Sequence, residues 1–167
     1  MLDMCQLTNR LTEHKYYGTY QQLAETLKKY SSAPMLDVQR FWEVVLFSWI
    51  TGNSDMHCKN FSLLDSGGGE YVLSPAYDLL AVLLADPEDT EEMAMSFTVG
   101  GEKSGFNHNT FITAFTQSGI PATVAEKMIE RMKAYLPQWN HLIDQSFLPD
   151  KMKADYHQLL SKRIELL

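Results

Sequence analysis

The hydrophobic and polar positions along the chain mostly follow helical spacing. Residues 20–30 carry apolar side chains three and four positions apart, and Thr19 and Gln22 form a capping-box pair in front of them. Residues 38–50 are apolar on most faces, so we predict a buried central helix with Asp37 as its N-cap. Three more helices are predicted: one capped by Asn109 and ending at Ser118 before Gly119, one from Pro121 to Tyr135, and one from Asp150 onward.

Two short apolar runs, 61–64 and 71–73, flank a turn with three glycines at 67–69 and predict a β-hairpin. No Lys-Ser or Lys-Thr pair follows these glycines, and a strand comes next, so a loose turn is favoured over a phosphate loop. A short helix at 79–84 and a second stretch of strand within 92–99 complete the predicted elements. The pattern therefore predicts a mainly α fold with one or two small β-hairpins.

Length and charge bound the class of protein. The 167 residues, 45% of them hydrophobic, suit a single domain over 1–167 or one lobe of a larger domain. The net charge of -7 makes direct nucleic-acid binding through a broadly basic surface an unfavoured function. Five acids lie within 86–92, and the rest of the chain holds 14 basic against 16 acidic residues. We interpret this run as a solvated loop, with a docking surface for a basic partner as the alternative.

The chain lacks the sequence features of export or membrane insertion. No basic stretch followed by an apolar one appears at residues 1–5, and the longest apolar stretch, 41–50, is too short to span a bilayer. Cys5 and Cys58 form no C-x-x-C pair, which agrees with free thiols in a reducing compartment. We therefore expect a cytoplasmic protein with no membrane association.

The polar segment 52–60, between the predicted central helix and the hairpin, is the candidate for chemistry. Asp55 and Asn60 have the D-x-x-x-x-N spacing of a protein-kinase catalytic loop, in which the carboxylate accepts the substrate hydroxyl proton and the amide oxygen holds Mg²⁺. Asp78 follows the hairpin, where a kinase places its second metal-binding carboxylate. Lys59 lies between Asp55 and Asn60 and is a candidate for neutralising phosphate charge.

Structural interpretations of these residues stay open beside the chemical ones. Asp55 is equally suited to a turn or helix cap, Asn60 to satisfying turn backbone, and Asp78 to capping the short helix after it. His57 and Cys58 next to Asp55 raise the alternative of a zinc site. Zinc ligands usually come in pairs at short spacing, which the other histidines do not provide, so zinc is unfavoured.

The segments 52–63 and 73–80 resemble the catalytic-loop and metal-binding motifs of HipA-like serine/threonine kinases, the kinase toxins of bacterial toxin–antitoxin modules. The shorter stretches 5–7, 12–17, 41–43 and 92–95 are also similar to this family, so the resemblance covers nearly the whole chain. It implies ATP as co-substrate, Mg²⁺ as cofactor and a protein serine or threonine as acceptor. The implied roles are Asp55 as catalytic base, Asn60 and Asp78 as Mg²⁺ ligands, and Lys59 and His57 as supporting loop residues.

The chain departs from the family in one respect. Family members carry an N-terminal lobe with a phosphate-covering loop and an ATP-binding lysine, and no such glycine-rich loop precedes Asp55 here. The resemblance therefore implies the helical C-lobe alone, with the N-terminal lobe absent and little activity by itself. We expect a lobe-supplying or antitoxin-like partner and an exposed apolar face; the alternative is a non-catalytic module that only binds such a partner.

Overall fold

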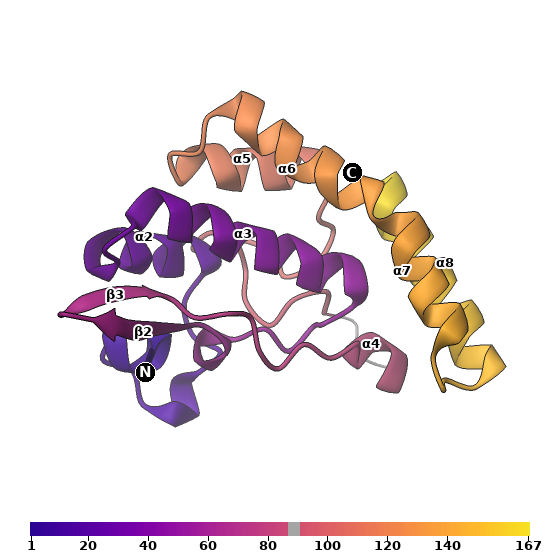
Figure 1. Cartoon of the computed structure of the whole chain (residues 1–167), viewed down its shortest axis with the longest axis horizontal. Coiled ribbons are helices and arrows are strands. Elements are labelled where there is room, and N and C mark those ends of the chain that lie inside the picture. Colours follow the sequence, from indigo (N-terminus) through magenta and orange to yellow (C-terminus); the bar gives the residue numbers. More distant parts are fainter. Residues whose placement is uncertain (87–90) are drawn as a thin grey trace.

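A computed structural model of the chain describes residues 1–86 and 91–167. In Figure 1, helices α2 and α3 lie between a small β-sheet on one side and α5 and α6 on the other, and α7 and α8 form a helical hairpin at one end. The helices are α1 (Met4–Leu7), α2 (Tyr20–Tyr30), α3 (Pro34–Thr51), α4 (Val82–Ala85), α5 (His108–Gln117), α6 (Ala122–Ala134), α7 (Leu136–Gln145) and α8 (Asp150–Glu165), with 3-10 turns η1 (Thr12–His14) and η2 (Cys58–Asn60). The strands are β1 (Leu2–Asp3), β2 (Ser62–Gly67) and β3 (Glu70–Leu73). The mainly helical fold predicted from the pattern is confirmed.

Helix α3 is the buried centre of the molecule, as its pattern predicted. Phe41, Trp42 and Trp49 are fully buried in a core that also contains aromatic side chains of α2 and α5. The Trp42 indole N–H donates to the Ser118 hydroxyl at 2.8 Å, so the one polar atom of this large side chain is satisfied. The helix thus fixes the position of the polar segment that follows it.

The predicted capping box of α2 is present, whereas the predicted start of α3 is wrong. Thr19 accepts the Gln22 N–H, and the Gln22 side chain accepts the Thr19 N–H. Helix α3 begins at Pro34, one turn earlier than predicted, because proline suits the first turn of a helix. Asp37 is consequently inside that turn and fully buried, where it accepts the backbone N–H of Leu73 at 2.7 Å. Its carboxylate joins α3 to the end of β3.

The predicted hairpin is β2 and β3, and it belongs to an antiparallel sheet with strand order β1-β2-β3. Strand β1 adds only the pairs Leu2 with Leu63 and Asp3 with Ser62, and these two residues are too short a signal to stand out in the pattern. The second predicted stretch of strand, 92–99, is wrong. It forms an irregular segment with a single bridge from Ser96 to Thr19, and its alternation reflects inward packing of Met93, Met95 and Phe97.

The C-terminal third differs from the prediction in one helix and one cap. Helix α5 is capped by Asn107, which accepts the Thr110 N–H, and not by Asn109. It ends before Gly119, whose φ of 86° matches the predicted left-handed position. The sequence pattern treated Pro137 as a stop, but this proline lies in the first turn of α7. Helix α8 begins at Asp150 as predicted.

A buried ion pair fastens α8 to the core. Arg163 Nη1 lies 2.7 Å from Glu92 Oε2, and its guanidinium stacks over the Trp49 ring at 4.6 Å. The same Glu92 oxygen accepts the Trp49 indole N–H at 2.9 Å. The interpretation of 86–92 as a solvated loop is therefore wrong at Glu92, and residues 87–90 lie outside the described part. No helix among the described residues is long and apolar enough to cross a membrane.

Candidate active site

The segment 52–60 is packed into the molecule, and only Asp55 and Lys59 are partly exposed in it. Gly52 ends α3 in the left-handed region, with φ of 77°, and turns the chain towards the sheet. The Tyr20 hydroxyl donates to the Met56 carbonyl at 2.6 Å, and the Cys58 N–H donates to the Lys15 carbonyl at 3.1 Å. Helix α2 and the segment before it therefore support this loop through hydrogen bonds to its backbone.

Asp55 points out of this rigid loop. Its side chain is 46% exposed, and its two oxygens have different neighbours. Oδ1 accepts the Tyr16 hydroxyl at 2.9 Å, and Oδ2 lies 3.9 Å from Nε2 of the buried His57. A carboxylate that is oriented by neighbours yet reachable from solvent is the arrangement that a general base requires.

Asn60 and Asp78, eighteen residues apart, meet across the end of the sheet. Asn60 Nδ2 donates to Asp78 Oδ2 at 2.7 Å, while Asn60 Oδ1 accepts the His57 backbone N–H at 2.9 Å. Asp78 is exposed, and Asn60 is buried. The two residues that the sequence named as metal ligands are thus in direct contact, one at the surface and one behind it.

The backbone at Asp78 is strained. Its φ of 57° lies in the left-handed region, which residues other than glycine adopt at a cost. Asn53 Nδ2 donates to the Asp78 carbonyl at 3.2 Å, so two asparagines of the loop hold this residue. Its neighbour Tyr77 donates to the Lys59 carbonyl at 2.6 Å and shares a 2.6 Å hydrogen bond with the Ser62 hydroxyl. These contacts lock the segment after β3 onto the loop.

His57 is a buried imidazole on which both carboxylates act. Burial lowers the pKa of His57, the charge of Lys15 acts in the same direction, and Asp55 and Asp78 both oppose the shift. Because both carboxylates act on one imidazole, the ring is within electrostatic range of each. The lowered pKa favours a neutral His57 at neutral pH, consistent with a structural role inside the loop.

The Lys59 side chain is paired with a carboxylate, whereas a phosphate contact requires a free ammonium. Its ammonium lies 3.3 Å from Asp3 Oδ2, at the junction of β1 and α1. The side chain is 37% exposed, so this ion pair is only partly shielded from water. A phosphate role for Lys59 stays a prediction, and it requires the lysine to leave Asp3.

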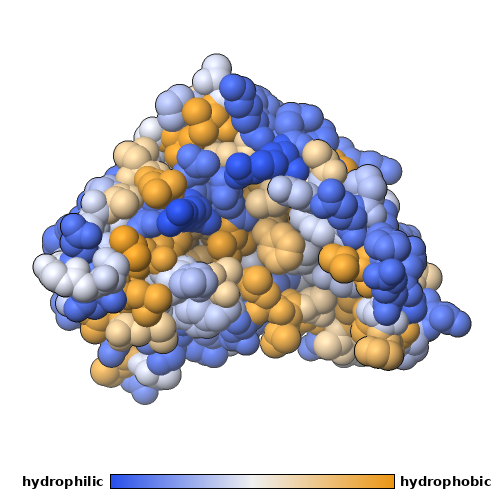
Figure 2. Space-filling model, viewed as in Figure 1, coloured by the Kyte–Doolittle hydropathy of each residue, from blue (hydrophilic) through white to orange (hydrophobic). Residues whose placement is uncertain are grey.

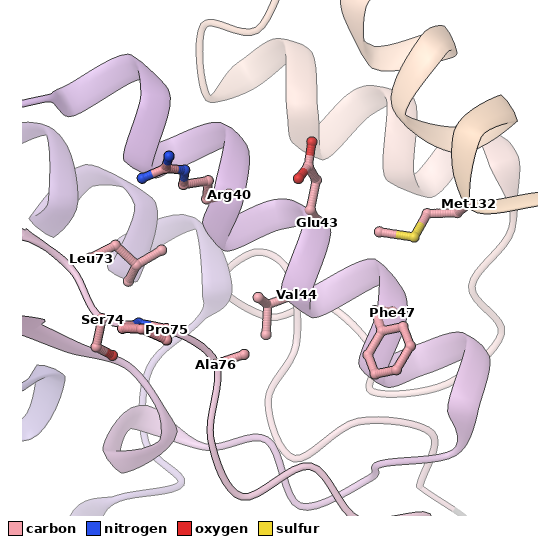
Figure 3. Close-up of a pocket in the computed structure, with 9 residues that line it drawn as sticks. All are labelled: Arg40, Glu43, Val44, Phe47, Leu73, Ser74, Pro75, Ala76 and Met132. Carbon is pink, nitrogen blue, oxygen red and sulfur yellow. The ribbon is translucent and has the colours of Figure 1, made fainter. Parts of the chain in front are cut away.

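Two hollows flank the site. One, of about 530 Å³, borders the exposed side of Asp55 and is lined by Tyr16, Ser54, Asp55, Val82, Glu91, Ala94 and Lys103. The other, of about 490 Å³, lies behind the strand-to-Asp78 segment. Figure 3 shows α3 side chains on one side of this second hollow, the segment from Leu73 to Ala76 opposite, and Met132 of α6 at its edge. Its lining is Arg40, Glu43, Val44, Phe47, Leu73, Ser74, Pro75, Ala76 and Met132.

Apolar side chains are also exposed close to the site. Leu79 and Leu80, directly after Asp78, are 42% and 62% exposed, and Met1 and Leu2 at the sheet edge are 74% and 39% exposed. Figure 2 shows apolar groups distributed over one face of the molecule between polar ones. Exposed apolar side chains thus lie next to Asp78, and the apolar face expected from the resemblance stays a prediction.

The donor atoms at this site suit magnesium better than zinc. Carboxylate and amide oxygens are the hard ligands that Mg²⁺ takes, and Mg²⁺ usually keeps several waters and binds few protein groups. Among residues 1–86 and 91–167, no three side chains of the His, Cys, Asp or Glu types converge as a metal cluster. Asp78 with Asn60 behind it fits one or two protein ligands for an ion whose other ligands come from phosphates and water.

Tyr16 and Asn53 contact the site residues but were not identified as part of it from the sequence. Tyr16 lies in the irregular turn after η1, thirty-nine residues before its partner Asp55. Asn53 is inside the polar segment, but nothing in the spacing distinguishes it from a helix-stop residue. Only the resemblance over 12–17 and 52–63 marked these stretches, and it assigned no role to either residue.

Comparison with known proteins gives a consistent result. The HipA-like C-terminal domain family matches residues 1–139. "Putative kinase Y4mE" of Sinorhizobium fredii is 35% identical over 97 residues, which are 56% of this chain and 23% of that protein. A "Putative kinase" of Haemophilus influenzae is 24% identical over 182 residues, covering 93% of this chain and 49% of that protein.

Solved structures share the fold at low identity. The HipA–HipB toxin–antitoxin complex with operator DNA from Shewanella oneidensis MR-1 matches with a TM-score of 0.78 and 21% identity, over 98% of this chain and 42% of that one. The Helicobacter pylori proinflammatory kinase CtkA matches with a TM-score of 0.63 and 15% identity, over 99% of this chain and 67% of that one.

The chain spans between about a quarter and a half of the length of the curated relatives it matches. The similarity therefore does not show that this chain has the activity of those whole proteins. It does show the family, because the family match covers more than three quarters of the chain and includes both motif segments. With the loop of Asp55 and Asn60 and the strand-to-Asp78 segment in contact, this chain belongs to the HipA-like C-terminal domain family.

Proposed function

We propose that this chain is the base- and metal-carrying half of a serine/threonine protein kinase. The observation that carries the proposal is the 2.7 Å hydrogen bond from Asn60 to Asp78, which joins the loop asparagine to the carboxylate after the hairpin. Asp55, on the same rigid loop, faces a hollow of about 530 Å³. Relatives named as kinases support the reaction class.

In the proposed reaction, the acceptor hydroxyl oxygen attacks the γ-phosphorus of ATP and the bond to the β–γ bridging oxygen breaks. Asp55 takes the hydroxyl proton, and ADP leaves with the bond electrons. When bound, Mg²⁺ neutralises charge on the phosphates. Asp78 would ligate the ion, and Asn60 would hold Asp78 in place or share the ion through its own amide oxygen.

His57 and Lys59 have supporting parts in this proposal. The buried His57 ring lies 3.9 Å from Asp55 Oδ2 and limits where the carboxylate can turn. The Lys59 carbonyl accepts the Tyr77 hydroxyl, so its backbone helps to hold the segment that carries Asp78. The Lys59 ammonium would reach phosphate only after leaving Asp3.

The proposal requires a second component. The described residues offer no phosphate-covering glycine loop, and phosphoryl transfer depends on holding both reactants in position. We infer that an N-terminal lobe or a lobe-supplying protein completes the ATP site. The second hollow and the exposed Leu79 and Leu80 lie beside the Asp78 segment, where such a component would make contact.

The test is phosphate transfer from ATP to myelin basic protein, measured for the 167-residue chain alone and for the complete protein, which here means the chain together with the N-terminal lobe or the lobe-supplying protein. We expect little transfer by the chain alone and Mg²⁺-dependent transfer by the complete protein. Asp55→Asn should abolish it. Asp65→Asn, a matched change at an exposed carboxylate of the hairpin, should leave it unchanged. Equal activity of Asp55→Asn and the parent protein would refute the proposal.

A non-catalytic binding module is the second candidate, and the apolar hollow between α3 and the Leu73–Ala76 segment favours it. The Shewanella HipA structure contains the antitoxin HipB, so an antitoxin-like protein is the partner to try. If Asp55→Asn preserves every cellular effect of the protein while Val44→Asp in the hollow abolishes partner binding, the binding module is the better account.

A further inference from the structure

Tyr16 contacts Asp55, the proposed base, from an irregular turn for which the sequence predicted no helix or strand. Its hydroxyl donates to Asp55 Oδ1 at 2.9 Å, across thirty-nine residues of sequence. The tyrosine lines the same hollow as Asp55, and it is 42% exposed, so its hydroxyl has water as an alternative partner. The hydroxyl therefore bonds to Asp55 although it is not forced to do so by burial away from water.

The tyrosine ring is held in place by its neighbours. It meets the His57 ring edge-on, with centroids 5.2 Å apart and planes at 76°, and His57 is only 5% exposed. The ammonium of Lys15 lies over the Tyr16 ring, 4.7 Å from the ring centroid. In addition, the Lys15 carbonyl accepts the Cys58 N–H, which ties this turn to the Asp55 loop. The hydroxyl is thus delivered to Asp55 by a preorganised side chain.

We infer that Tyr16 is a positioning residue for Asp55, an inference that rests on the proposed function. The terminal torsion of an aspartate is broad, so an unrestrained Asp55 carboxylate would rotate freely in its exposed position. Tyr16 anchors Oδ1 and His57 lies beside Oδ2, which fixes the carboxylate plane. Oδ2 would then be the oxygen that takes the proton of the acceptor hydroxyl. Misplacing a base by about 1 Å costs on the order of 10²-fold in rate.

The test compares Tyr16→Phe with Tyr17→Phe in the complete native protein, with ATP, Mg²⁺ and myelin basic protein as reactants. Tyr17 is the matched control, because its ring stacks on His14 at 4.9 Å and its side chain is 63% exposed. For Tyr16→Phe we expect kcat to fall by about 10- to 100-fold, the effect of losing one hydrogen bond to a charged group. KM for ATP should stay within about twofold, since positioning of the base acts after ATP binds.

Several outcomes would overturn the inference. An unchanged kcat in Tyr16→Phe, with activity abolished in Asp55→Asn, rejects Tyr16 and leaves the proposed function intact. A higher kcat would mean that the phenol occupies the acceptor position and obstructs the base. Activity that survives Asp55→Asn rejects the proposed function itself.

A second measurement uses the 167-residue chain alone and requires no enzymatic activity. Thermal unfolding midpoints are compared for Tyr16→Phe, Asp55→Ala and the double variant. We expect Tyr16→Phe to lower the midpoint in the parent chain and to have little further effect once Asp55 is alanine. Fully additive effects would show that the tyrosine does not act through Asp55, and would overturn the inference.

Discussion

The ion pair between Arg163 and Glu92 predicts how strongly α8 is fastened to the core. The change to make is Arg163→Leu, which keeps an apolar stem but removes the guanidinium. In the structure the Arg163 side chain is 6% exposed and that of Glu92 is 22% exposed, so neither charge is well solvated. The arginine also stacks on Trp49, and both contacts disappear together.

The expected loss in unfolding free energy depends on the Glu92 carboxylate, which stays in place without its arginine. Removing one partner of a buried pair costs about 3–5 kcal/mol, because the other charge is left without its partner. Glu92 retains the Trp49 indole N–H at 2.9 Å and the Phe106 N–H at 3.3 Å, so the lower end applies. We expect a loss of about 3 kcal/mol, which for a chain of this size is a fall in Tm of about 6–12 °C.

Thermal and urea unfolding of the chain measure this loss. The matched control is Arg131→Leu, because Arg131 also pairs with a glutamate, Glu43, but is 50% exposed. Glu43 is 21% exposed, close to the 22% of Glu92, so the two pairs differ in the exposure of their arginines. A pair whose arginine is open to water contributes about 0–1 kcal/mol, so Arg131→Leu should change Tm by no more than about 4 °C. If Arg163→Leu is no more destabilising than Arg131→Leu, the buried pair does not anchor α8 and the reasoning is refuted.

Three further changes test the loop and its supports. Gly52→Ala should cost about 1–3 kcal/mol in urea unfolding, because φ is 77° and the new Cβ would lie 2.6 Å from Leu159 Cδ2; an unchanged midpoint would contradict this. Tyr20→Phe should cost about 1–3 kcal/mol by leaving the Met56 carbonyl unpaired, and a loss below about 0.5 kcal/mol would argue against that bond. Burial raises the pKa of the Cys58 thiol from 9.0 to about 11. The unfolded chain therefore releases this proton first, and unfolding free energy should fall by up to about 1.4 kcal/mol per pH unit between pH 9 and 11. Cys58→Ala should reduce that slope; the same slope in this variant would refute the assignment.

Local signals along the chain predicted the elements that depend on local energetics. The capping box of Thr19 and Gln22 satisfies its own backbone donors, so it defines the start of α2 with little help from the rest of the molecule. The apolar pattern of 38–50 predicted a buried helix. It did not decide whether that helix begins at Pro34 or after Asp37 as its N-cap. Pro34 occupies the first turn, and Asp37 serves β3 through a contact thirty-six residues away.

The same distinction separates the site residues that were predicted from those that were not. Asn60 and Asp78 were singled out because their order around a hairpin follows a known catalytic arrangement, and the structure brings the two side chains into contact. Their role as metal ligands stays a prediction. Tyr16 could not be identified, because its bond to Asp55 depends on how an irregular turn packs against the loop. Glu92 was misinterpreted because a charge run gives no sign that one member pairs with a buried arginine.

The failure to predict α7 has another physical origin. Pro137 was interpreted as the residue after a helix end, a position that proline often takes. Proline is equally suited to the first turn of the next helix, and α6 and α7 follow each other with only Tyr135 between them. Only packing of the apolar residues Trp139 and Ile143 against the core decides between the two.

We propose that Asp78, held in place by Asn60, ligates the metal that accompanies ATP. The most direct measurement is a calorimetric titration of the complete protein with ATP in the presence of Mg²⁺, for the parent, Asp78→Asn and Asp65→Asn. We predict that Asp78→Asn loses the Mg²⁺-dependent part of ATP binding, while Asp65→Asn binds like the parent. Equal Mg²⁺-dependent binding by Asp78→Asn and the parent would contradict the account.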